Sequence, residues 1–117
     1  MKDHKLGMEK YNIREYWNKR AEIGKDSYEK VCVYGLPIHC NRILEIMQRD
    51  CLNYLLRIEK KRILEVGCGV GRWGKFMIGK GACYTGVDIS PKMIEIARKN
   101  VPEGEFYVID GGTRVSR

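Results

Sequence analysis

Apolar residues recur at three- and four-residue spacing in the first half of the chain, which predicts helices. Residues 13–23 fit one helix, with aromatic side chains on adjoining turns. A longer repeat predicts an amphipathic helix of about five turns, capped by Asn41 and running to Glu59. Its apolar positions are Leu44, Met47, Cys51, Tyr54 or Leu55, and Ile58. Residues 1–61 therefore form a helical lead segment.

The pattern changes at residue 62, where short β-compatible runs begin to alternate with helical ones. Strands are predicted at 62–66, 82–87 and 106–109, and helices at 72–80 and 91–100, the latter opened by Ser90 and Pro91. Helical crossovers of this length imply parallel strands in a right-handed βαβαβ unit, strand order 3-2-1, with helices covering both faces. The expected fold class is α/β, a Rossmann-like three-layer sandwich, with its core at 62–111.

Length and composition limit the chain to one domain. It has 117 residues, 44% of them hydrophobic, so a core can be buried. No stretch approaches the roughly 18 consecutive apolar residues of a membrane span, and no apolar secretory core follows the start, so we expect a cytoplasmic protein that does not engage membranes. The net charge of +7 is spread along the chain, which favours a solvated surface over a nucleic-acid partner.

The five cysteines, an odd number at irregular spacing, predict reduced thiols. Because no Cys-x-x-Cys pair occurs and only two histidines could assist, no metal site is expected.

A glycine-rich loop, residues 66–74, joins the first predicted strand to its helix. It contains the pattern G-x-G-x-x-G, and its glycines allow a tight turn and a close approach of a ligand to the helix start. Asp88 follows Gly69 by 19 residues at the end of the second strand, where a carboxylate can accept hydrogen bonds from both ribose hydroxyls. Loop and acid together predict a site for a nucleoside-containing cofactor.

Two cofactor classes fit this arrangement, a dinucleotide and S-adenosylmethionine. Glu65 precedes the first glycine by two residues, at the tip of the first strand. A carboxylate there would repel a pyrophosphate but would attract the ammonium group of S-adenosylmethionine. The residues therefore favour the methyl donor, and an NAD-binding Rossmann oxidoreductase remains an alternative because of the literal glycine pattern.

Three segments in the expected order resemble the class I S-adenosylmethionine-dependent methyltransferases. Residues 63–71, ILEVGCGVG, resemble their first motif, residues 84–93, YTGVDISPKM, their second-strand motif, and residues 106–111, FYVIDG, the third. Upstream, residues 16–21, YWNKRA, resemble the lead helix of small-molecule methyltransferases. The resemblance covers residues 16–111.

The resemblance implies a role for each matching residue. Glu65 and the loop would hold the methionine end, Asp88 the ribose, and Asp110 with Gly111 the adenine. Apolar contacts with adenine or ribose would come from the second strand and its helix, and the lead helix would close over the methionine carboxylate. The implied cofactor-binding residues are Glu65, Gly67, Cys68, Gly69, Gly71, Asp88, Ile89, Met93, Asp110, Gly111, Tyr16 and Arg20. Cys68 is expected to be a small loop residue, because direct methyl transfer needs no enzyme nucleophile.

The implied reaction is methyl transfer from S-adenosylmethionine to a small-molecule acceptor, with no catalytic base identified in this chain. The family fold has seven strands, of which three are predicted here, so most of the acceptor site is not accounted for. A truncated domain that binds the cofactor without turnover is the alternative. The open edge of the first strand, 63–66, is apolar and exposes backbone groups, which predicts a homodimer. The alternative is that residues 30–40 or the carboxy-terminal tail fold over this edge and keep the chain monomeric.

Overall fold

The computed structural model describes residues 12–24, 27–32, 35–55, 57–111 and 115–116. Its helices are α1 (Ile13–Ile23), α2 (Ser27–Val31), α3 (Ile38–Leu55), α4 (Arg72–Gly79) and α5 (Pro91–Asn100). Its strands are β1 (Arg62–Val66), β2 (Cys83–Asp88), β3 (Glu105–Ile109) and β4 (Val115–Ser116). The predicted α1, β1 and α5 are confirmed to the residue, and the other predicted elements except α3 agree within a residue at each end.

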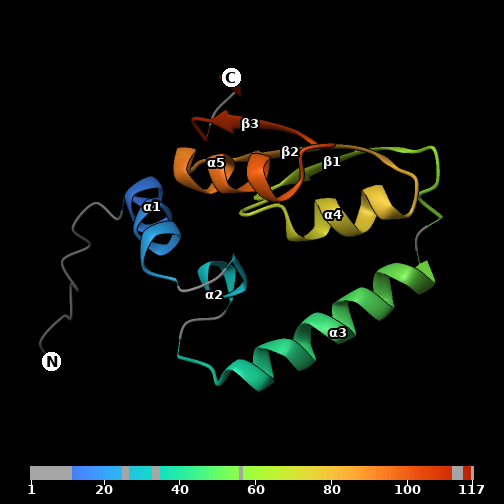
Figure 1. Cartoon of the computed structure of the whole chain (residues 1–117), viewed down its shortest axis with the longest axis horizontal. Coiled ribbons are helices and arrows are strands. Elements are labelled where there is room, and N and C mark those ends of the chain that lie inside the picture. The colour runs from blue at the N-terminus through green and yellow to red at the C-terminus, as the bar shows by residue number, and fades with distance from the viewer. Residues whose placement is uncertain (1–11, 25–26, 33–34, 56, 112–114, 117) are drawn as a thin grey trace, which may run out of the picture.

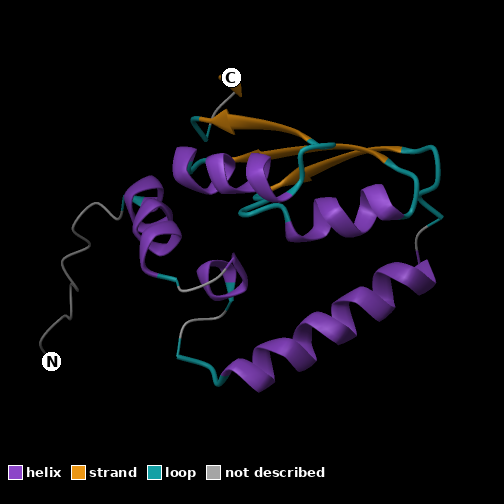
Figure 2. Cartoon of the chain, in the orientation of Figure 1, coloured by secondary structure: helices purple, strands orange, loops and turns teal. Residues whose placement is uncertain are grey.

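The strands form one sheet in the order β1-β2-β3-β4, in which β2 pairs in parallel with both β1 and β3 (Figure 2). The register places Glu65 beside Gly86 and Asp88 beside Val108. This confirms the βαβαβ unit and its strand order 3-2-1. The short strand β4 was not predicted; it pairs antiparallel with β3 and so lies at the edge opposite β1.

Helices α4 and α5 lie on the same face of the sheet, with the other helices beside or beyond them (Figure 1). The expectation of helices on both faces is therefore not met by the described residues. The reason is geometric, because two successive right-handed crossovers that move in the same direction place both helices on one side. Leu64 and Val66, whose side chains lie on the opposite face, are 64% and 72% exposed.

The main core lies between the sheet and the two crossover helices. Tyr84 and Phe106 pack from neighbouring strands with their ring centroids 5.8 Å apart, and Ile94 and Ala97 of α5 are fully buried against this layer. Gly74 lets α4 approach the sheet closely, since a Cβ at that position would lie 2.6 Å from the Tyr84 ring. A second cluster joins Ala21 of α1 to Val70 and Met93, and so fixes the lead segment to the glycine loop.

The long helix α3 differs from its prediction at both ends. It begins at Ile38, and the backbone N–H groups of Cys40 and Asn41 both donate to the Pro37 carbonyl. Asn41 therefore lies in the first turn, where its side chain donates to the Leu36 carbonyl at 3.2 Å. The Pro37 carbonyl thus accepts the first hydrogen bonds of the helix, and α3 begins before Asn41 and not after it.

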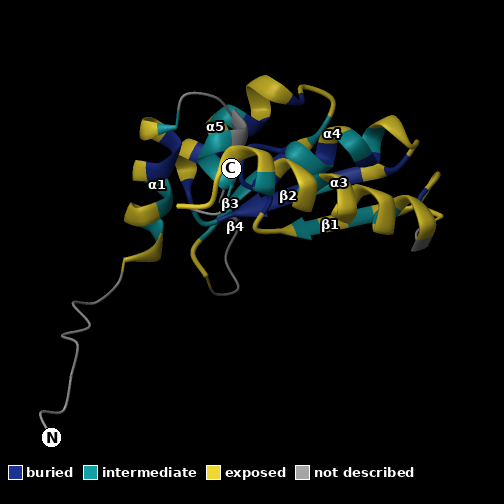
Figure 3. Cartoon of the chain, turned by 90° about the horizontal axis from the view of Figure 1, so that it is seen from below, coloured by how far each residue is buried: buried dark blue, intermediate teal, exposed yellow. Residues whose placement is uncertain are grey.

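The carboxyl end of α3 also falls short of the predicted Glu59, because the helix ends at Leu55. Ile58, counted in the helical repeat, instead lies in the main core at 6% exposure. Most of α3 is exposed, whereas β2 is largely buried (Figure 3). In the described part of the chain, no helix combines the length and apolar character needed to cross a membrane.

Candidate functional site

A cavity of about 390 Å³ opens at the carboxyl ends of β1 and β2, beside the glycine loop. In parallel α/β sheets, ligands bind beyond these strand ends. One wall is the loop and the start of α4, another is the end of β2 with α5, and the third comes from the lead segment. The lining residues are Ile13, Trp17, Val31, Val66, Gly67, Cys68, Gly69, Arg72, Trp73, Asp88, Ile89, Met93 and Ile109.

The loop takes its shape from glycines in the left-handed region of backbone conformation. Gly67 has φ +76°, and a Cβ built on it would meet nothing within 4 Å, so this side of the backbone is open. Gly69 has φ +53°, and its Cβ would lie 2.8 Å from Cγ1 of Val31. Side chains other than glycine rarely adopt such angles. The sequence at these positions therefore keeps the loop tight and lets Val31 pack against it.

Asp88 holds the loop to the end of β2. Its Oδ2 accepts a hydrogen bond from the Gly69 N–H at 2.9 Å, and its Oδ1 accepts one from the Ser90 N–H, also at 2.9 Å. The residue is only 8% exposed, yet it lines the cavity. A carboxylate oxygen can accept more than one hydrogen bond, so both oxygens keep the capacity to bind ligand hydroxyls.

Helix α1 closes one side of the cavity because polar contacts dock it on the start of α5. The Ser90 hydroxyl donates to Oδ1 of Asn18 at 2.6 Å while accepting from the Met93 N–H, and Arg14 donates to the Ile89 carbonyl at 3.2 Å. This docking places Trp17 at the cavity. The predicted N-cap role of Ser90 is confirmed by its bond to Met93.

Arg20 points away from the cavity and binds α2 instead. It is 7% exposed, and its guanidinium donates to the carbonyls of Glu29 and Cys32, both at 2.9 Å, and to that of Lys30 at 3.4 Å. The guanidinium thus satisfies carbonyls at and beyond the end of α2. Because Val31 lies among these residues, Arg20 positions one wall of the cavity from behind.

Glu65 lies beneath the loop, on the helix-covered face of the sheet. It does not line the cavity; the Tyr84 hydroxyl donates to its Oε1 at 2.7 Å. Burial raises the pKa of the Glu65 carboxyl, the bond from Tyr84 and the charge of Arg72 lower it, and the charge of Asp88 raises it. Since Arg72 and Asp88 both line the cavity, Glu65 contributes to the electrostatic potential there.

Cys68 is buried inside the loop at 6% exposure. Burial raises the pKa of its thiol, and the charges of Asp88 and Glu65 raise it further. The thiol therefore stays protonated at neutral pH, which removes the nucleophilic thiolate form. The five cysteines are all free thiols, and the described residues hold no group of three or more potential metal ligands.

The structure brings six of the twelve predicted site residues together around the cavity, namely Gly67, Cys68, Gly69, Asp88, Ile89 and Met93. Gly71 lines a different cavity, between α3 and α4. Tyr16 is 36% exposed and stacks edge-on against Trp17 with the ring centroids 5.1 Å apart. Asp110 and Gly111 are exposed just beyond β3, and Gly111 has φ +87°.

Several lining residues were not predicted, above all Trp17 and Val31 of the lead segment. On α1, Tyr16 and Arg20 were predicted because residues 16–21 resemble the lead helix of small-molecule methyltransferases. Trp17, between them, is the side chain that lines the cavity. Ile109 could have been inferred, because it ends a strand at the same edge as Asp88. Arg72 and Trp73 open α4 directly after the glycines.

Comparison with known proteins assigns the family of this segment. Residues 63–113 match the family model described as a methyltransferase domain. The match contains the glycine loop, Asp88 and the βαβαβ unit, so this segment belongs to the class I S-adenosylmethionine-dependent methyltransferases.

Curated relatives agree with that assignment. The chain is 34% identical over 89 residues to the mitochondrial ubiquinone biosynthesis O-methyltransferase of Schizosaccharomyces pombe, a match that covers 66% of this chain and 32% of the relative. It is 38% identical over 48 residues to the ubiquinone biosynthesis O-methyltransferase of Pasteurella multocida, a match that covers 41% of this chain and 20% of the relative. Both alignments span a third or less of these relatives' own length.

The fold resembles that of magnesium protoporphyrin IX methyltransferase from Synechocystis PCC 6803, solved with bound SAH. The TM-score is 0.60 at 20% identity, and the match covers 84% of this chain and 50% of that one. The likeness confirms the Rossmann-like methyltransferase fold.

Proposed function

We propose that the protein binds S-adenosylmethionine in the cavity at the ends of β1 and β2 and acts in methyl transfer to a small molecule. The observation that carries the proposal is the position of Asp88. Its carboxylate is fixed by Gly69 and Ser90, and it lines a cavity whose other walls are glycine backbone and apolar side chains. The family match of residues 63–113 supports the same cofactor.

The residues present fit this cofactor chemically. Asp88 would accept hydrogen bonds from the ribose hydroxyls, while Ile89 and Met93 would pack against the adenine or ribose. The open side of Gly67 would admit the methionine end. Asp110 and Gly111, just beyond β3, would serve the adenine amino group and a ring nitrogen. When bound, the cofactor supplies an electrophilic sulfonium methyl group.

At the methionine end, the chain provides charge as well as shape. Glu65 lies under the loop and interacts electrostatically with Arg72 and Asp88, so its negative charge would favour the α-ammonium group. Arg72 lines the cavity and offers a cation for the carboxylate. The remaining protein contribution is positioning, since holding donor and acceptor in line supplies much of the rate of such a transfer.

An oxygen atom is the acceptor we propose. Both curated relatives described above are named as ubiquinone biosynthesis O-methyltransferases, which supports an oxygen acceptor. A cytoplasmic location is proposed as well, supported by five cysteines that are all free thiols.

Isothermal titration calorimetry tests the cofactor directly. Titration of the protein with S-adenosylhomocysteine should show saturable binding, and titration with NAD should show none. Tight NAD binding without a response to S-adenosylhomocysteine would reject the proposal. Methyl transfer is tested separately, with radiolabelled S-adenosylmethionine and a panel of small phenols and catechols, and counting labelled product distinguishes O-methylation from binding alone.

A further inference from the structure

A second cavity, of about 650 Å³, lies between α3 and α4 and carries an excess of positive charge. It extends from the outer side of the glycine loop to the end of α5, and Arg72 is the residue that it shares with the cofactor cavity. Its charged lining residues are Arg42, Glu45, Arg49, Arg72 and Lys75. Four cations therefore face one anion, and the cavity has the size of a small-molecule site.

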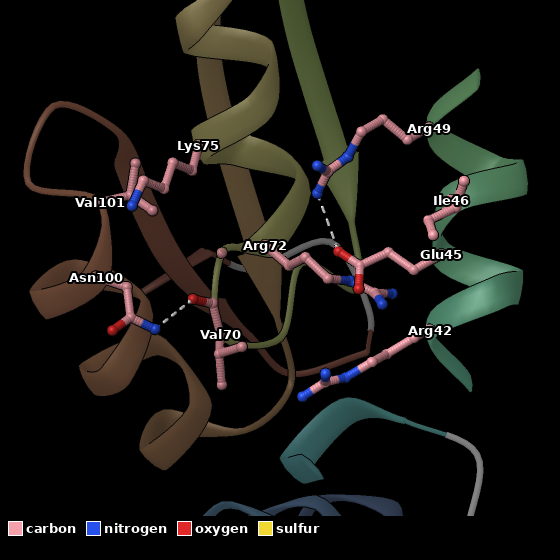
Figure 4. Close-up of a pocket in the computed structure, with 10 residues that line it drawn as sticks. Arg42, Glu45, Ile46, Arg49, Val70, Arg72, Lys75, Asn100 and Val101 are labelled. Atoms are coloured by element: carbon pink, nitrogen blue, oxygen red, sulfur yellow. Dashed lines mark hydrogen bonds and ion pairs between the residues drawn. The ribbon is translucent and has the colours of Figure 1, made fainter. Parts of the chain in front are cut away.

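Figure 4 shows that Arg42 and Arg72 lie between the two helices, whereas Lys75 extends from the other side of α4 toward Val101. Arg42 extends from α3 toward the glycine loop, and Arg72 extends from α4 toward α3. Arg49 bends to Glu45, with its Nη2 3.1 Å from the carboxylate Oε1. In the part of the chain that the structure describes, neither Arg42 nor Lys75 has an ion-pair partner.

Like charges gathered on opposite walls repel one another, and an anion between them would relieve that repulsion. Three of the four cations are arginines, whose planar guanidinium groups form paired hydrogen bonds with phosphate oxygens. The side chain of Asn100 is bound to the Val70 carbonyl at 3.1 Å, which holds the loop that forms the cavity floor.

We propose that the cavity between α3 and α4 is a binding site for the phosphate group of an anionic ligand, next to the cofactor site and sharing Arg72 with it. The site does not depend on methyl transfer, and it accounts for basic residues that the cofactor cavity leaves unused. Glu45 limits the affinity, because its carboxylate faces the same space and neutralises Arg49.

Calorimetric titration of the whole protein with inorganic pyrophosphate at low ionic strength tests the site. Wild type should bind, and the Arg42→Gln/Lys75→Gln double variant should bind at least about tenfold more weakly, because charge-assisted hydrogen bonds are lost. The matched control is Arg57→Gln/Lys61→Gln, which removes the same charge from exposed residues outside the cavity and should bind like wild type. Absence of wild-type binding, or equal losses in both double variants, would overturn the proposal.

A gain of affinity gives a second test that loss of folding cannot mimic. Glu45→Gln removes the only acidic side chain among the described lining residues and should strengthen pyrophosphate binding about three- to tenfold. Unchanged or weaker binding by this variant would contradict the site.

The source of the phosphate is resolved in parallel. Sedimentation with phosphatidylglycerol vesicles, compared with phosphatidylcholine vesicles, shows whether a lipid headgroup is bound through Arg42 and Lys75, and pyrophosphate shows binding of a free phosphate. A short RNA that binds in an Arg42- and Lys75-dependent way, while pyrophosphate does not, would replace the small-ligand proposal with a nucleic-acid surface.

Discussion

The carboxylate of Asp88 accepts a hydrogen bond from the backbone N–H of Gly69 at 2.9 Å, which ties the end of β2 to the middle of the glycine loop. The same carboxylate accepts from the Ser90 N–H at the start of α5. One acidic side chain thus joins the loop, the strand and the helix that surround the proposed cofactor site. It is expected to contribute to stability as well as to ligand affinity.

Replacement of Asp88 by alanine should separate these two contributions. Two backbone N–H groups lose their acceptor, so the free energy of unfolding should fall by about 2–4 kcal/mol in urea titrations. After correction for the fraction of unfolded protein, binding of S-adenosylhomocysteine should weaken by about 1.5–3 kcal/mol, because the charge-assisted bonds to ribose are lost. A variant that binds with wild-type affinity would remove Asp88 from the site.

Gly69→Val should abolish cofactor binding. A β-branched residue resists φ +53°, and its Cβ would lie 2.8 Å from Val31, so the loop and α2 cannot both keep their positions. Gly35→Val is the matched control, because Gly35 also has positive φ, its Cβ would meet nothing within 4 Å, and it does not line the cofactor cavity. Calorimetry should show near wild-type binding for Gly35→Val, and normal binding by Gly69→Val would place the cofactor elsewhere.

Arg20 is expected to be a positioning residue for the cavity wall. Arg20→Ala should destabilise the fold by about 2–4 kcal/mol, since half-buried carbonyls lose a buried, charged donor. Arg20→Lys should rescue only part of this loss, because a single ammonium nitrogen cannot replace both Nη2, which donates to Glu29 and Cys32, and Nε, which donates to Lys30. Thermal unfolding measures the effect, and a fully stable Arg20→Lys variant would contradict the geometric argument.

The negative charge of Glu65 is expected to lower the stability of the fold and to raise the affinity for the cofactor. Its pKa is raised above 4.5 in the folded state, chiefly by burial. Well below pH 4.5 the Glu65 carboxyl is protonated in both the folded and the unfolded protein, so its burial does not lower the free energy of unfolding through its charge. As the pH rises through the folded pKa, the unfolded state has already ionised and the folded state is penalised. Glu65→Gln removes this penalty and should gain stability relative to wild type as the pH rises toward 7.

Urea unfolding between pH 4 and pH 7 checks the Glu65 prediction, with the exposed Glu103→Gln as the control. At pH 7 the Glu65→Gln variant should bind S-adenosylmethionine more weakly, because a negative charge near the α-ammonium group is lost. A stability difference that does not change with pH would show that Glu65 is not penalised by burial, and unchanged affinity would remove it from the site.

The sequence predicts this fold best where a helix or strand is bounded by residues next to it in the chain, such as helix caps and glycines. The limits of α5 follow from Ser90 and Pro91, and the short run of β1 is bounded by charge and glycine, so both agree with the structure. The five-residue helix α2 gives no periodic signal, and it depends on Arg20 from another helix. For the same reason Trp17 and Val31 could not be placed at the cavity, because their positions come from tertiary docking.

The edge of β1 is open in the described part of the chain. Among the described residues, β2 is the only strand that pairs with β1, and β4, near the carboxy terminus, pairs with β3 at the opposite edge. Neither residues 30–40 nor the carboxy-terminal tail adds a described strand to the β1 edge. The Lys61 carbonyl and the Gly67 N–H both bond toward β2, so the backbone groups of Arg62, Leu64 and Val66 face outward. The exposed side chains of Leu64 and Val66 lie beside these unpaired groups.

We propose that two copies pair through this edge about a two-fold axis at Leu64. Antiparallel pairing would place Leu64 opposite its symmetry mate and Arg62 opposite Val66, so the outward backbone groups would bond while the exposed apolar side chains join across the axis. Sedimentation equilibrium should then show a dimer, more so at high salt, because the charge of +7 on each chain opposes association. Leu64→Glu should give a monomer, whereas Tyr54→Glu, at a residue 91% exposed on α3, should leave the dimer intact. A monomer mass for wild type at every concentration and salt would refute this pairing.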